Sequence, residues 1–300
     1  MPNQPLVSVI MNCYNGEKFL REAIDSVLSQ TYKNWELVFW DNCSTDKSAE
    51  IAKSYDGKLE YFCGNETVNL YAARVQAIEH AKGDYLSFLD VDDWWHATKL
   101  EKQVKSALSC NAALAYSDYI LEDQLEEKKS IIYGNRIKKQ EDVVCSMASD
   151  YTVGLLTLFI KKDAYFQVGG FDQDFHIIGD FDLVLRLAAN FPVCCVNEPL
   201  AHYRWHGANE SIKNATLQIN ELEDLVKKYR SSGTFSRKVI LSLISKIEFQ
   251  KLSIDINQKK RFRSLQYLFK INNPKFFLKA IAKLVLPVRF IKFLKSEVTP

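Results

Sequence analysis

Short apolar runs alternate with amphipathic segments through the first ninety residues, and this alternation constrains the fold more than any other feature of the chain. The apolar runs have the length of buried strands, and the segments between them carry apolar residues at helical spacing. The four predicted strands are residues 6–11, 35–40, 59–62 and 85–89. Strands that alternate with helices form a mainly parallel sheet covered by helices on both faces. We therefore predict an α/β fold.

Polar side chains follow three of these strands at the point where each strand ends. Asn12 and Tyr14 follow the first strand, Asp41 follows the second, and an acidic turn begins at Asp90 after the fourth. Ligands of parallel α/β sheets bind beyond the carboxyl ends of the strands. The sequence therefore predicts that these three distant pieces of chain form one cleft.

The acidic turn holds three carboxylates within four residues, Asp90, Asp92 and Asp93. Such crowding is repulsive unless a cation or a polar cleft offsets it. Mg²⁺ binds a few carboxylates and completes its shell with water and substrate phosphate oxygens, so Asp90 and Asp92 are candidate metal ligands. The alternative is a solvated acidic turn that only begins the next helix, but the buried strand before it and the two tryptophans after it favour the metal site.

The sequence disfavours the usual phosphate-binding loops. No Gly-x-Gly-x-x-Gly follows the first strand, and no Gly-x-x-x-x-Gly-Lys-Ser/Thr occurs anywhere in the chain. A nucleotide can still be held by a carboxylate, ring stacking and a metal. Asp41 matches the N–H donor of a uracil or thymine ring, and Tyr14 could line that ring, although Asp41 alone is as consistent with a helix-capping turn.

An ordered set of motifs resembles the family-2 glycosyltransferases, which have the GT-A fold, a Rossmann-like, mainly parallel sheet with helices on both faces. The resemblance runs from about residue 6 to about residue 210. The motifs are Val7-Ser8-Val9-Ile10 with Tyr14-Asn15, Asp41-x-x-Ser44-Thr45-Asp46, Ala73-Arg74, Phe88-Leu89-Asp90-Val91-Asp92-Asp93 and Gly169-Gly170-Phe171-Asp172. Asn42-Cys43, Val75 and Ala97 depart from the usual pattern and leave the choice of nucleotide open.

The resemblance implies a role for each group of residues. A Mg²⁺ or Mn²⁺ ion on Asp90 and Asp92 would bridge the diphosphate of a nucleotide sugar, with His206 as a further ligand or a structural hydrogen-bonding residue. Asp93, Trp94 and Trp95 would lie on the acceptor side. The residues implied in binding the donor are Asn12, Tyr14, Asp41, Arg74, Asp90, Val91 and Asp92.

Asp180 matches the position of the catalytic base in this family, and Gly179 stands where a glutamate is customary. An ionised carboxylate suits proton removal from a sugar hydroxyl. Without the resemblance, the simpler interpretation is a helix N-terminal carboxylate that stabilises the helix dipole. Asp182 fits that structural role better than Asp180 does.

These residues together predict an inverting glycosyltransferase that transfers a sugar from a nucleotide sugar to a glycan or lipid-linked acceptor. A UDP-sugar is the favoured donor. The resemblance suggests bacterial cell-surface polysaccharide or lipopolysaccharide synthesis. The alternative is a non-catalytic nucleotide-sugar-binding protein or a membrane-docked scaffold. A phosphatase-like nucleophile pair at Asp90 and Asp92 is disfavoured, because Trp94 stands where that motif requires Thr or Val.

The charge balance divides the chain into a predicted catalytic domain, residues 1–210, and a helical, basic, amphipathic region, residues 211–300. Residues 211–300 contain 19 basic and 6 acidic side chains, which leaves 20 basic and 31 acidic ones before them. Within residues 256–295, eleven Lys or Arg and no acid alternate with aromatic and aliphatic residues. This composition is typical of a helix at an anionic membrane surface, although packing on the catalytic domain is the alternative.

The cellular compartment is predicted from what the sequence contains and lacks. Seven scattered cysteines without a Cys-x-x-Cys pair indicate a reducing environment. Neither a signal peptide nor a transmembrane run is visible, and no nucleic-acid-binding motif accompanies the basic region. We therefore expect a cytoplasmic protein, peripheral on the inner face of the cell membrane, with no nucleic-acid partner.

Overall fold

The computed structural model describes residues 4–134, 143–207, 209 and 214–285. The chain forms two compact units. The first contains the described residues of Met1–Val143 and Thr152–Asn209, and the second those of Val144–Tyr151 and Glu210–Pro300. The second unit thus includes a short segment, Val144–Tyr151, that the sequence analysis placed within the catalytic domain.

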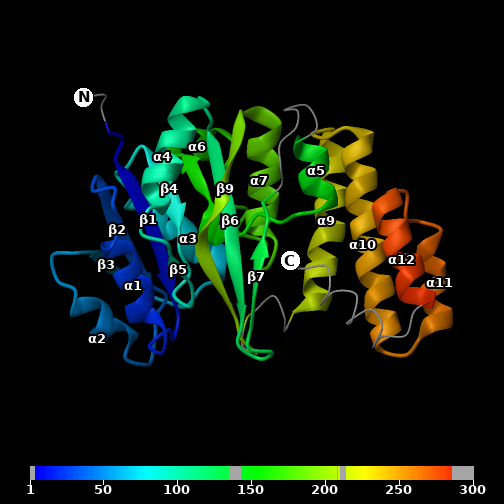
Figure 1. Ribbon diagram of the computed structural model, residues 1–300, viewed down its shortest axis with the longest axis horizontal. Coiled ribbons are helices and arrows are strands. Elements are labelled where there is room, and N and C mark those ends of the chain that lie inside the picture. The colour runs from blue at the N-terminus through cyan, green and yellow to red at the C-terminus, as the bar shows by residue number, and fades with distance from the viewer. Residues whose placement is uncertain (1–3, 135–142, 208, 210–213, 286–300) are drawn as a thin grey trace. The chain divides into compact units, whose positions relative to one another are not determined.

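One mixed sheet forms the centre of the first unit (Figure 1). Its strands follow the order β3-β2-β1-β4-β8-β6-β9-β5, and β7 pairs with β6. The strands are β1 (Val7–Cys13), β2 (Trp35–Asp41), β3 (Glu60–Cys63), β4 (Tyr85–Phe88), β5 (Trp94–Trp95), β6 (Leu114–Asp123), β7 (Lys128–Ile132), β8 (Phe159–Lys161) and β9 (Val193–Trp205).

The four strands predicted from the sequence are β1 to β4, and they pair in parallel. Beyond β4 the sheet becomes mixed, because β8 runs antiparallel to both β4 and β6. Strand β9 is 13 residues long, and it continues past two register shifts against β6 to reach Trp205. The unpredicted β5 pairs with it, Trp94 opposite His202. This pairing brings the end of β9 to the acidic turn.

Helices of the first unit pack on the sheet through apolar faces. In β1, Val7, Val9 and Met11 belong to one core cluster with residues of α1 and α4, so the alternate residue Asn12 points to the other face. The helices are α1 (Leu20–Leu28), α2 (Ser48–Lys53), α3 (Leu70–Glu79), α4 (Lys99–Ser109), α6 (Lys162–Gln167) and α7 (Gly179–Asn190), with a 3₁₀ turn, η2 (Leu155–Thr157).

The second unit is helical, as the sequence predicts for this region. Its helix α10 contacts α9, α11 and α12. A small apolar cluster joins α10 to the segment that follows, and it includes Leu252, Ile256 and Phe276. No helix among the described residues is both long and apolar enough to span a bilayer. The helices are α9 (Ala215–Ser232), α10 (Arg237–Asn257), α11 (Arg261–Leu268) and α12 (Pro274–Val285), with α5 (Val143–Ser149) at the boundary.

Candidate active site

The acidic turn leaves the sheet directly after β4. The Asp93 N–H donates to the Asp90 carbonyl oxygen at 3.1 Å, which closes the turn. The side chains of Asp90 and Asp92 are 34% and 28% exposed, whereas Asp93 is buried. Val91 packs closely beneath the loop after β1, since a Cβ on Gly16 would lie 2.6 Å from its Cγ2 atom. Asp90 and Asp92 are therefore the two carboxylates that a ligand can reach.

Side chains from α3 and from the end of β9 hold these two carboxylates. The Arg74 Nη2 atom lies 2.6 Å from Asp90 Oδ1, in a salt bridge whose arginine is 3% exposed. The His206 Nε2 atom lies 3.1 Å from Asp92 Oδ2. Four residues predicted to bind donor or metal thus meet at one place, although α3 and the end of β9 are far from the turn in sequence.

Arg204 also holds the turn, although it is not among the site residues predicted from the sequence. Its backbone N–H donates to Asp93 Oδ1 and its Nε–H to the Asp92 carbonyl oxygen, both at 2.8 Å. Its guanidinium lies 4.3 Å from the Phe19 ring centroid and 4.4 Å from that of Trp94. The spacing of residues 202, 204 and 206 in a strand places them on one face, and this signal could have identified Arg204.

The electrostatics of the turn favour a cation. Burial, and next the charge of Asp90, raises the pKa of Asp92, while His206 acts in the opposite direction. Burial, and next the charges of Asp92 and Asp90, raises the pKa of Asp93 well above its usual value. Carboxylates that disfavour each other's ionisation are stabilised in the charged form by a cation nearby.

The donor atoms at the turn fit Mg²⁺ or Mn²⁺, which bind carboxylate oxygen and accept imidazole nitrogen. Within the described residues, however, no group of three or more His, Cys, Asp or Glu side chains is arranged to hold a metal unaided. Asp92 and His206 would hold such an ion beside Asp90, with the remaining ligands supplied by water and by phosphate oxygens of a bound molecule.

Two further polar residues lie at the ends of the neighbouring strands β1 and β2. Asn12 is 8% exposed, and within the described part of the chain neither atom of its amide has a hydrogen-bond partner. Asp41 is 1% exposed and accepts hydrogen bonds from the Ser44 N–H at 2.8 Å and the Tyr61 hydroxyl at 2.7 Å. An unpaired buried amide costs free energy, so a ligand with both a donor and an acceptor would stabilise this place. Tyr14 is 55% exposed.

Asp180 lies in the first turn of α7 and is half-buried. Its Oδ1 atom is 3.0 Å from the hydroxyl oxygen of Tyr71. Asp182 differs from it, because it is fully buried and its carboxylate pairs with Arg186 one turn along the same helix. The structure therefore engages Asp182 within the helix and leaves Asp180 partly accessible.

The three residues predicted on the acceptor side differ in exposure. Asp93 and Trp95 are buried, and the Trp95 Nε1–H donates to the Leu156 carbonyl oxygen at 2.9 Å. Trp94 is half-buried and stacks on His202, with ring centroids 4.6 Å apart. Trp94 is therefore the one of the three that an acceptor could touch in this conformation, and the acceptor role itself stays a prediction.

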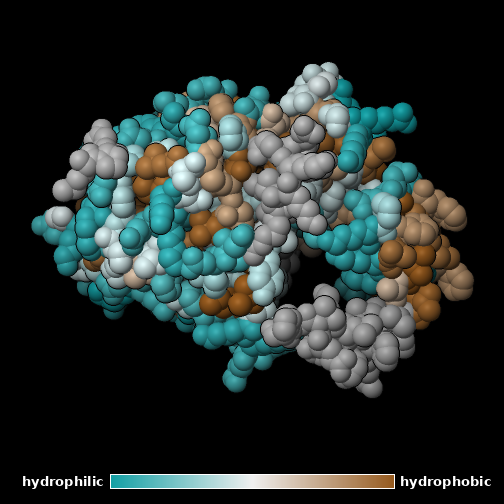
Figure 2. Space-filling view, turned by 45° about the horizontal axis from the view of Figure 1, so that its top comes forward, coloured by the Kyte–Doolittle hydropathy of each residue, from teal (hydrophilic) through white to brown (hydrophobic). Residues whose placement is uncertain are grey.

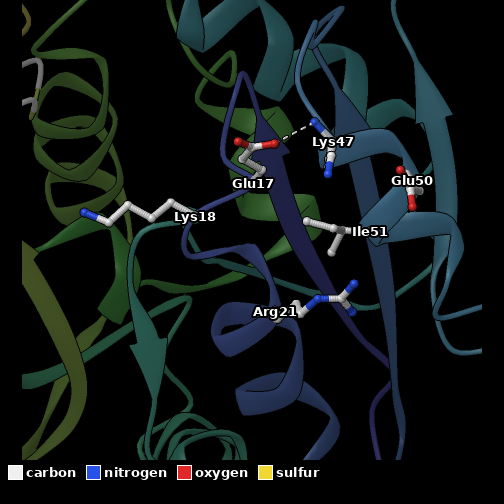
Figure 3. A pocket seen from close by; sticks show the side chains of 6 residues that line it. All are labelled: Glu17, Lys18, Arg21, Lys47, Glu50 and Ile51. Carbon is white, nitrogen blue, oxygen red and sulfur yellow. Dashed lines mark hydrogen bonds between the residues drawn. The ribbon is translucent and has the colours of Figure 1, made fainter.

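A separate surface hollow of about 620 Å³ lies beside α1 and α2 (Figure 3). Figure 3 shows Lys18 pointing away from the other lining side chains and Glu17 accepting a hydrogen bond from the Lys47 backbone. The lining contains charges of both signs and none of the predicted site residues, so we assign it no part in the site. The lining residues are Glu17, Lys18, Arg21, Lys47, Glu50 and Ile51.

Comparison with known proteins identifies the family. The model of "Glycosyl transferase family 2" matches residues 8–163. An uncharacterised glycosyltransferase of Rickettsia typhi is 32% identical over 225 residues, which cover 74% of this chain and 70% of the relative. The Escherichia coli protein WfgD, a UDP-Glc:alpha-D-GlcNAc-diphosphoundecaprenol beta-1,3-glucosyltransferase, is 27% identical over 231 residues, 77% of this chain and 86% of WfgD.

A solved structure gives the same result for the fold. The mannosyltransferase PcManGT of Pyrobaculum calidifontis, in complex with GDP-Man and Mn²⁺, superposes with a TM-score of 0.60 at 15% identity, over 99% of this chain and 80% of that one. The predicted GT-A fold, followed by a helical region, is confirmed. With its motifs, its fold and its relatives in agreement, the chain belongs to glycosyl transferase family 2.

Proposed function

We propose that this chain is a metal-dependent, inverting glycosyltransferase whose donor is a nucleotide sugar, with a UDP-sugar as the favoured donor. One observation carries the proposal. Three features lie at the carboxyl ends of the adjacent strands β1, β2 and β4. They are the Asn12 amide, which has no partner among the described residues, the buried carboxylate of Asp41, and the partly exposed carboxylates of Asp90 and Asp92. A nucleotide diphosphate has the matching parts, a base with donors and acceptors and a diphosphate that binds cations.

The preference for uracil rests on Asp41 and Asn12. A uracil ring presents one N–H donor between two carbonyl acceptors. Each carboxylate oxygen of Asp41 accepts one hydrogen bond from the protein and keeps a second lone pair for the ring N–H. The Asn12 amide can donate to a carbonyl, and the exposed ring of Tyr14 can cover the base. WfgD is named for UDP-Glc, whereas PcManGT was solved with GDP-Man.

The residues then divide the chemistry between them. Asp92, His206 and Asp90 would hold Mg²⁺ or Mn²⁺, and a bound cation supplies neutralisation of the charge on the departing diphosphate. Asp180 takes the proton of the acceptor hydroxyl while the oxygen of that hydroxyl attacks the anomeric carbon from the face opposite the diphosphate. One C–O bond forms, the bond to the diphosphate oxygen breaks, and the configuration inverts.

We further propose a lipid-linked acceptor and a peripheral position on the inner face of a bacterial cell membrane, in polysaccharide or lipopolysaccharide synthesis. WfgD is named for a diphosphoundecaprenol acceptor. In this chain, Phe262 and Phe269 are 95% and 89% exposed, and Figure 2 shows apolar residues gathered over α11 and α12. Basic side chains and no acids accompany them in residues 256–285. The predicted membrane segment continues through 286–295, which lie outside the described residues.

A turnover assay tests the proposal. Purified protein is incubated with UDP-Glc, UDP-GlcNAc or GDP-Man and a diphosphate-lipid acceptor, with Mn²⁺ or with EDTA, and the release of nucleoside diphosphate is measured. We expect release from a UDP-sugar that needs both Mn²⁺ and acceptor. Donor binding without turnover, on every acceptor tried, would favour the alternative, a nucleotide-sugar-binding or membrane-docked scaffold protein.

A further inference from the structure

The residue before the predicted base is a glycine because a tyrosine ring fills the space beside it. A Cβ built on Gly179 would lie 2.7 to 2.8 Å from three atoms of the Tyr71 ring. Real Cβ atoms essentially never approach other atoms below 3.0 Å. Any residue other than glycine at 179, including the glutamate that is customary in the family, would therefore displace the ring or the first turn of α7.

The Tyr71 ring cannot move aside easily. Tyr71 is 3% exposed. Its ring centroid lies 5.2 Å from that of Phe171 and 5.1 Å from the Arg74 Cζ atom. Interiors are close-packed, so a displaced ring would need a cavity that well-packed interiors rarely contain. The missing side chain at Gly179 thus leaves the space that the Tyr71 ring occupies beside the start of α7.

The Tyr71 hydroxyl has two acceptors within reach and one hydrogen to donate. Its oxygen lies 3.0 Å from Asp180 Oδ1 and 3.1 Å from the Ile177 carbonyl oxygen. A hydrogen bond to an ionised carboxylate is stronger than one to a neutral carbonyl. Burial, and next the charge of Asp180, raises the pKa of Tyr71 well above its usual value, so the phenol keeps its proton.

We propose that Tyr71 is a positioning residue for the base, and that Gly179 is present to admit it. The phenol donates to the ionised Asp180 and orients its carboxylate toward the acceptor hydroxyl. When Asp180 takes up the acceptor proton, the phenol turns to the Ile177 carbonyl and loses no hydrogen bond. This inference rests on the proposed function, because it requires Asp180 to be the base.

The same ring links the base to the donor side of the site. Arg74 lies over one face of Tyr71 and forms the salt bridge with Asp90. The base, the phenol, the arginine and the first carboxylate of the acidic turn therefore form one continuous chain of contacts. A change at Tyr71 that removes only the hydroxyl leaves Arg74 and its ring contact in place, which separates the two roles.

A double-mutant cycle tests the positioning role. The variants are Y71F, D180N and Y71F/D180N, and kcat, KM and donor Kd are measured for each. Loss of one hydrogen bond to a charged group predicts a kcat lowered about tenfold to a hundredfold in Y71F, with donor Kd unchanged. In the D180N background, Y71F should lower kcat no further. The matched control is Y32F, which removes another buried hydroxyl, bonded to the Pro5 carbonyl at 2.6 Å, and should keep wild-type kcat.

The outcomes separate this inference from the function on which it rests. Wild-type kcat in D180N would overturn the base assignment and the positioning role with it. A large loss in D180N with wild-type kcat in Y71F would overturn the positioning role alone. An equal loss from Y71F in both backgrounds would show that the hydroxyl acts on the structure and not through Asp180.

Exchanging the side chains at positions 71 and 179 tests whether Gly179 is needed to admit the Tyr71 ring. G179E should lower kcat strongly because its Cβ meets the Tyr71 ring, and Y71A should lower kcat because the phenol is absent. The double variant Y71A/G179E removes the overlap and supplies a second carboxylate beside Asp180, so we expect a kcat at least about tenfold above G179E. Wild-type kcat in G179E would contradict the claim that Gly179 is present to admit Tyr71. The same holds if the double variant shows no recovery of kcat while both proteins keep the wild-type circular-dichroism spectrum.

Discussion

The two units of this chain differ in which of their side chains depart most from the usual arrangement of apolar groups inside and polar groups outside. The first unit buries polar groups, among them Asn12, Arg74 and Asp93, whereas the second exposes large apolar side chains such as Phe262 and Phe269. Each arrangement costs free energy in an isolated chain. In the first unit most of that cost is offset by fixed internal partners, and in the second the rings of Phe262 and Phe269 lie exposed. The first unit therefore contains the candidate active site, and the second presents exposed apolar rings on its surface.

The acidic and basic side chains follow the same division. Acidic residues exceed basic ones in the first 210 residues by 31 to 20, and basic residues exceed acidic ones in the remainder by 19 to 6. In the first unit, Asp41, Asp90 and Asp92 lie at the carboxyl edge of the sheet. In the second, the lysines and arginines accompany exposed apolar rings. The following predictions test whether the two units work independently, beginning with the largest expected effect.

Removing the base should abolish chemistry in the first unit and leave the second unaffected. We expect D180N to lower kcat by about 10²–10⁴, the usual value of general base catalysis, with donor Kd and vesicle binding unchanged. Initial rates, calorimetry and sedimentation with vesicles measure the three quantities. D25N, at an exposed carboxylate of α1 that accepts a hydrogen bond from Tyr55, is the control and should match the wild type. Full activity in D180N would contradict the site assignment.

Removing a metal ligand should affect donor binding and not only turnover. D92N replaces a carboxylate that hydrogen-bonds His206 with a neutral amide. We expect donor affinity in Mn²⁺ to fall to the value measured with EDTA, since a carboxylate is a much better ligand for this hard ion than an amide. Donor Kd is measured with and without Mn²⁺ for D92N and wild type. A D92N protein whose donor affinity still rises with Mn²⁺ would show that the ion binds elsewhere.

Changing the exposed rings should do the reverse and affect the surface alone. We expect F262S/F269S to bind anionic vesicles at least about tenfold more weakly, because the variant has no phenyl rings at these positions to bury in the lipid. Turnover of a soluble acceptor should be unchanged. Salt should weaken wild-type binding, since each Lys or Arg near the surface contributes about 1 kcal/mol. L125S, at a 66% exposed leucine of the first unit, is the control. Equal binding by F262S/F269S and wild type would remove these rings from the membrane surface.

Removing the chain after residue 255 would be a less specific test of the same surface than these point variants. Helix α10 ends at Asn257, and Leu252 and Ile256 share an apolar cluster with Phe276. A chain that ends at 255 would expose part of this cluster and add an apolar surface of its own. The truncated protein would therefore confuse loss of the membrane surface with loss of packing.

The smallest expected effect concerns the buried Lys99, whose Nζ donates to Ser87 Oγ and Gln103 Oε1. Among the described residues, no carboxylate forms a salt bridge with it. Burial lowers the pKa of Lys99 well below its usual value. Between that lowered value and the unfolded value of about 10.4, the unfolded chain binds more protons, so this residue makes stability rise with pH.

K99M should remove that dependence. We expect the change in Tm between pH 7 and pH 10 to become more negative, or less positive, in K99M than in wild type, with K105M at an exposed position of the same helix as control. Melting curves of the three proteins at both pH values measure it. An identical pH dependence in K99M and wild type would contradict the lowered pKa of this buried amine.

The sequence was sufficient for the parts of the molecule that are fixed by local pattern. Strands β1 to β4 and helix α1 follow from periodicity, and the family motifs predicted the GT-A fold. The acidic turn and Asp41 could be recognised because strand ends carry ligands in such sheets. Their roles in the reaction stay predictions until the experiments above are done.

The missed features depend on pairings between distant segments. Strand β5 has two residues, too few for a periodic signal, and it exists only because it pairs with β9. The contact of Tyr71 with Gly179 joins positions 108 apart in the chain, and the antiparallel position of β8 is set by tertiary packing. Val144–Tyr151 joins the second unit for the same reason, since a short amphipathic segment does not specify its partner.

The position of Arg204 has a consequence for the synthesis of the protein. Its backbone and side chain fix the acidic turn, and its Nη2–H also reaches Glu22 Oε2 at 2.5 Å. A ribosome releases residues 90–93 long before residue 204, because domains emerge from the N-terminus. The strands around the turn can pair early, yet the turn lacks its last support until β9 is complete. We infer that a nascent chain acquires its core before it acquires its site, so that chains released before residue 204 would lack a formed site even where their first strands are folded.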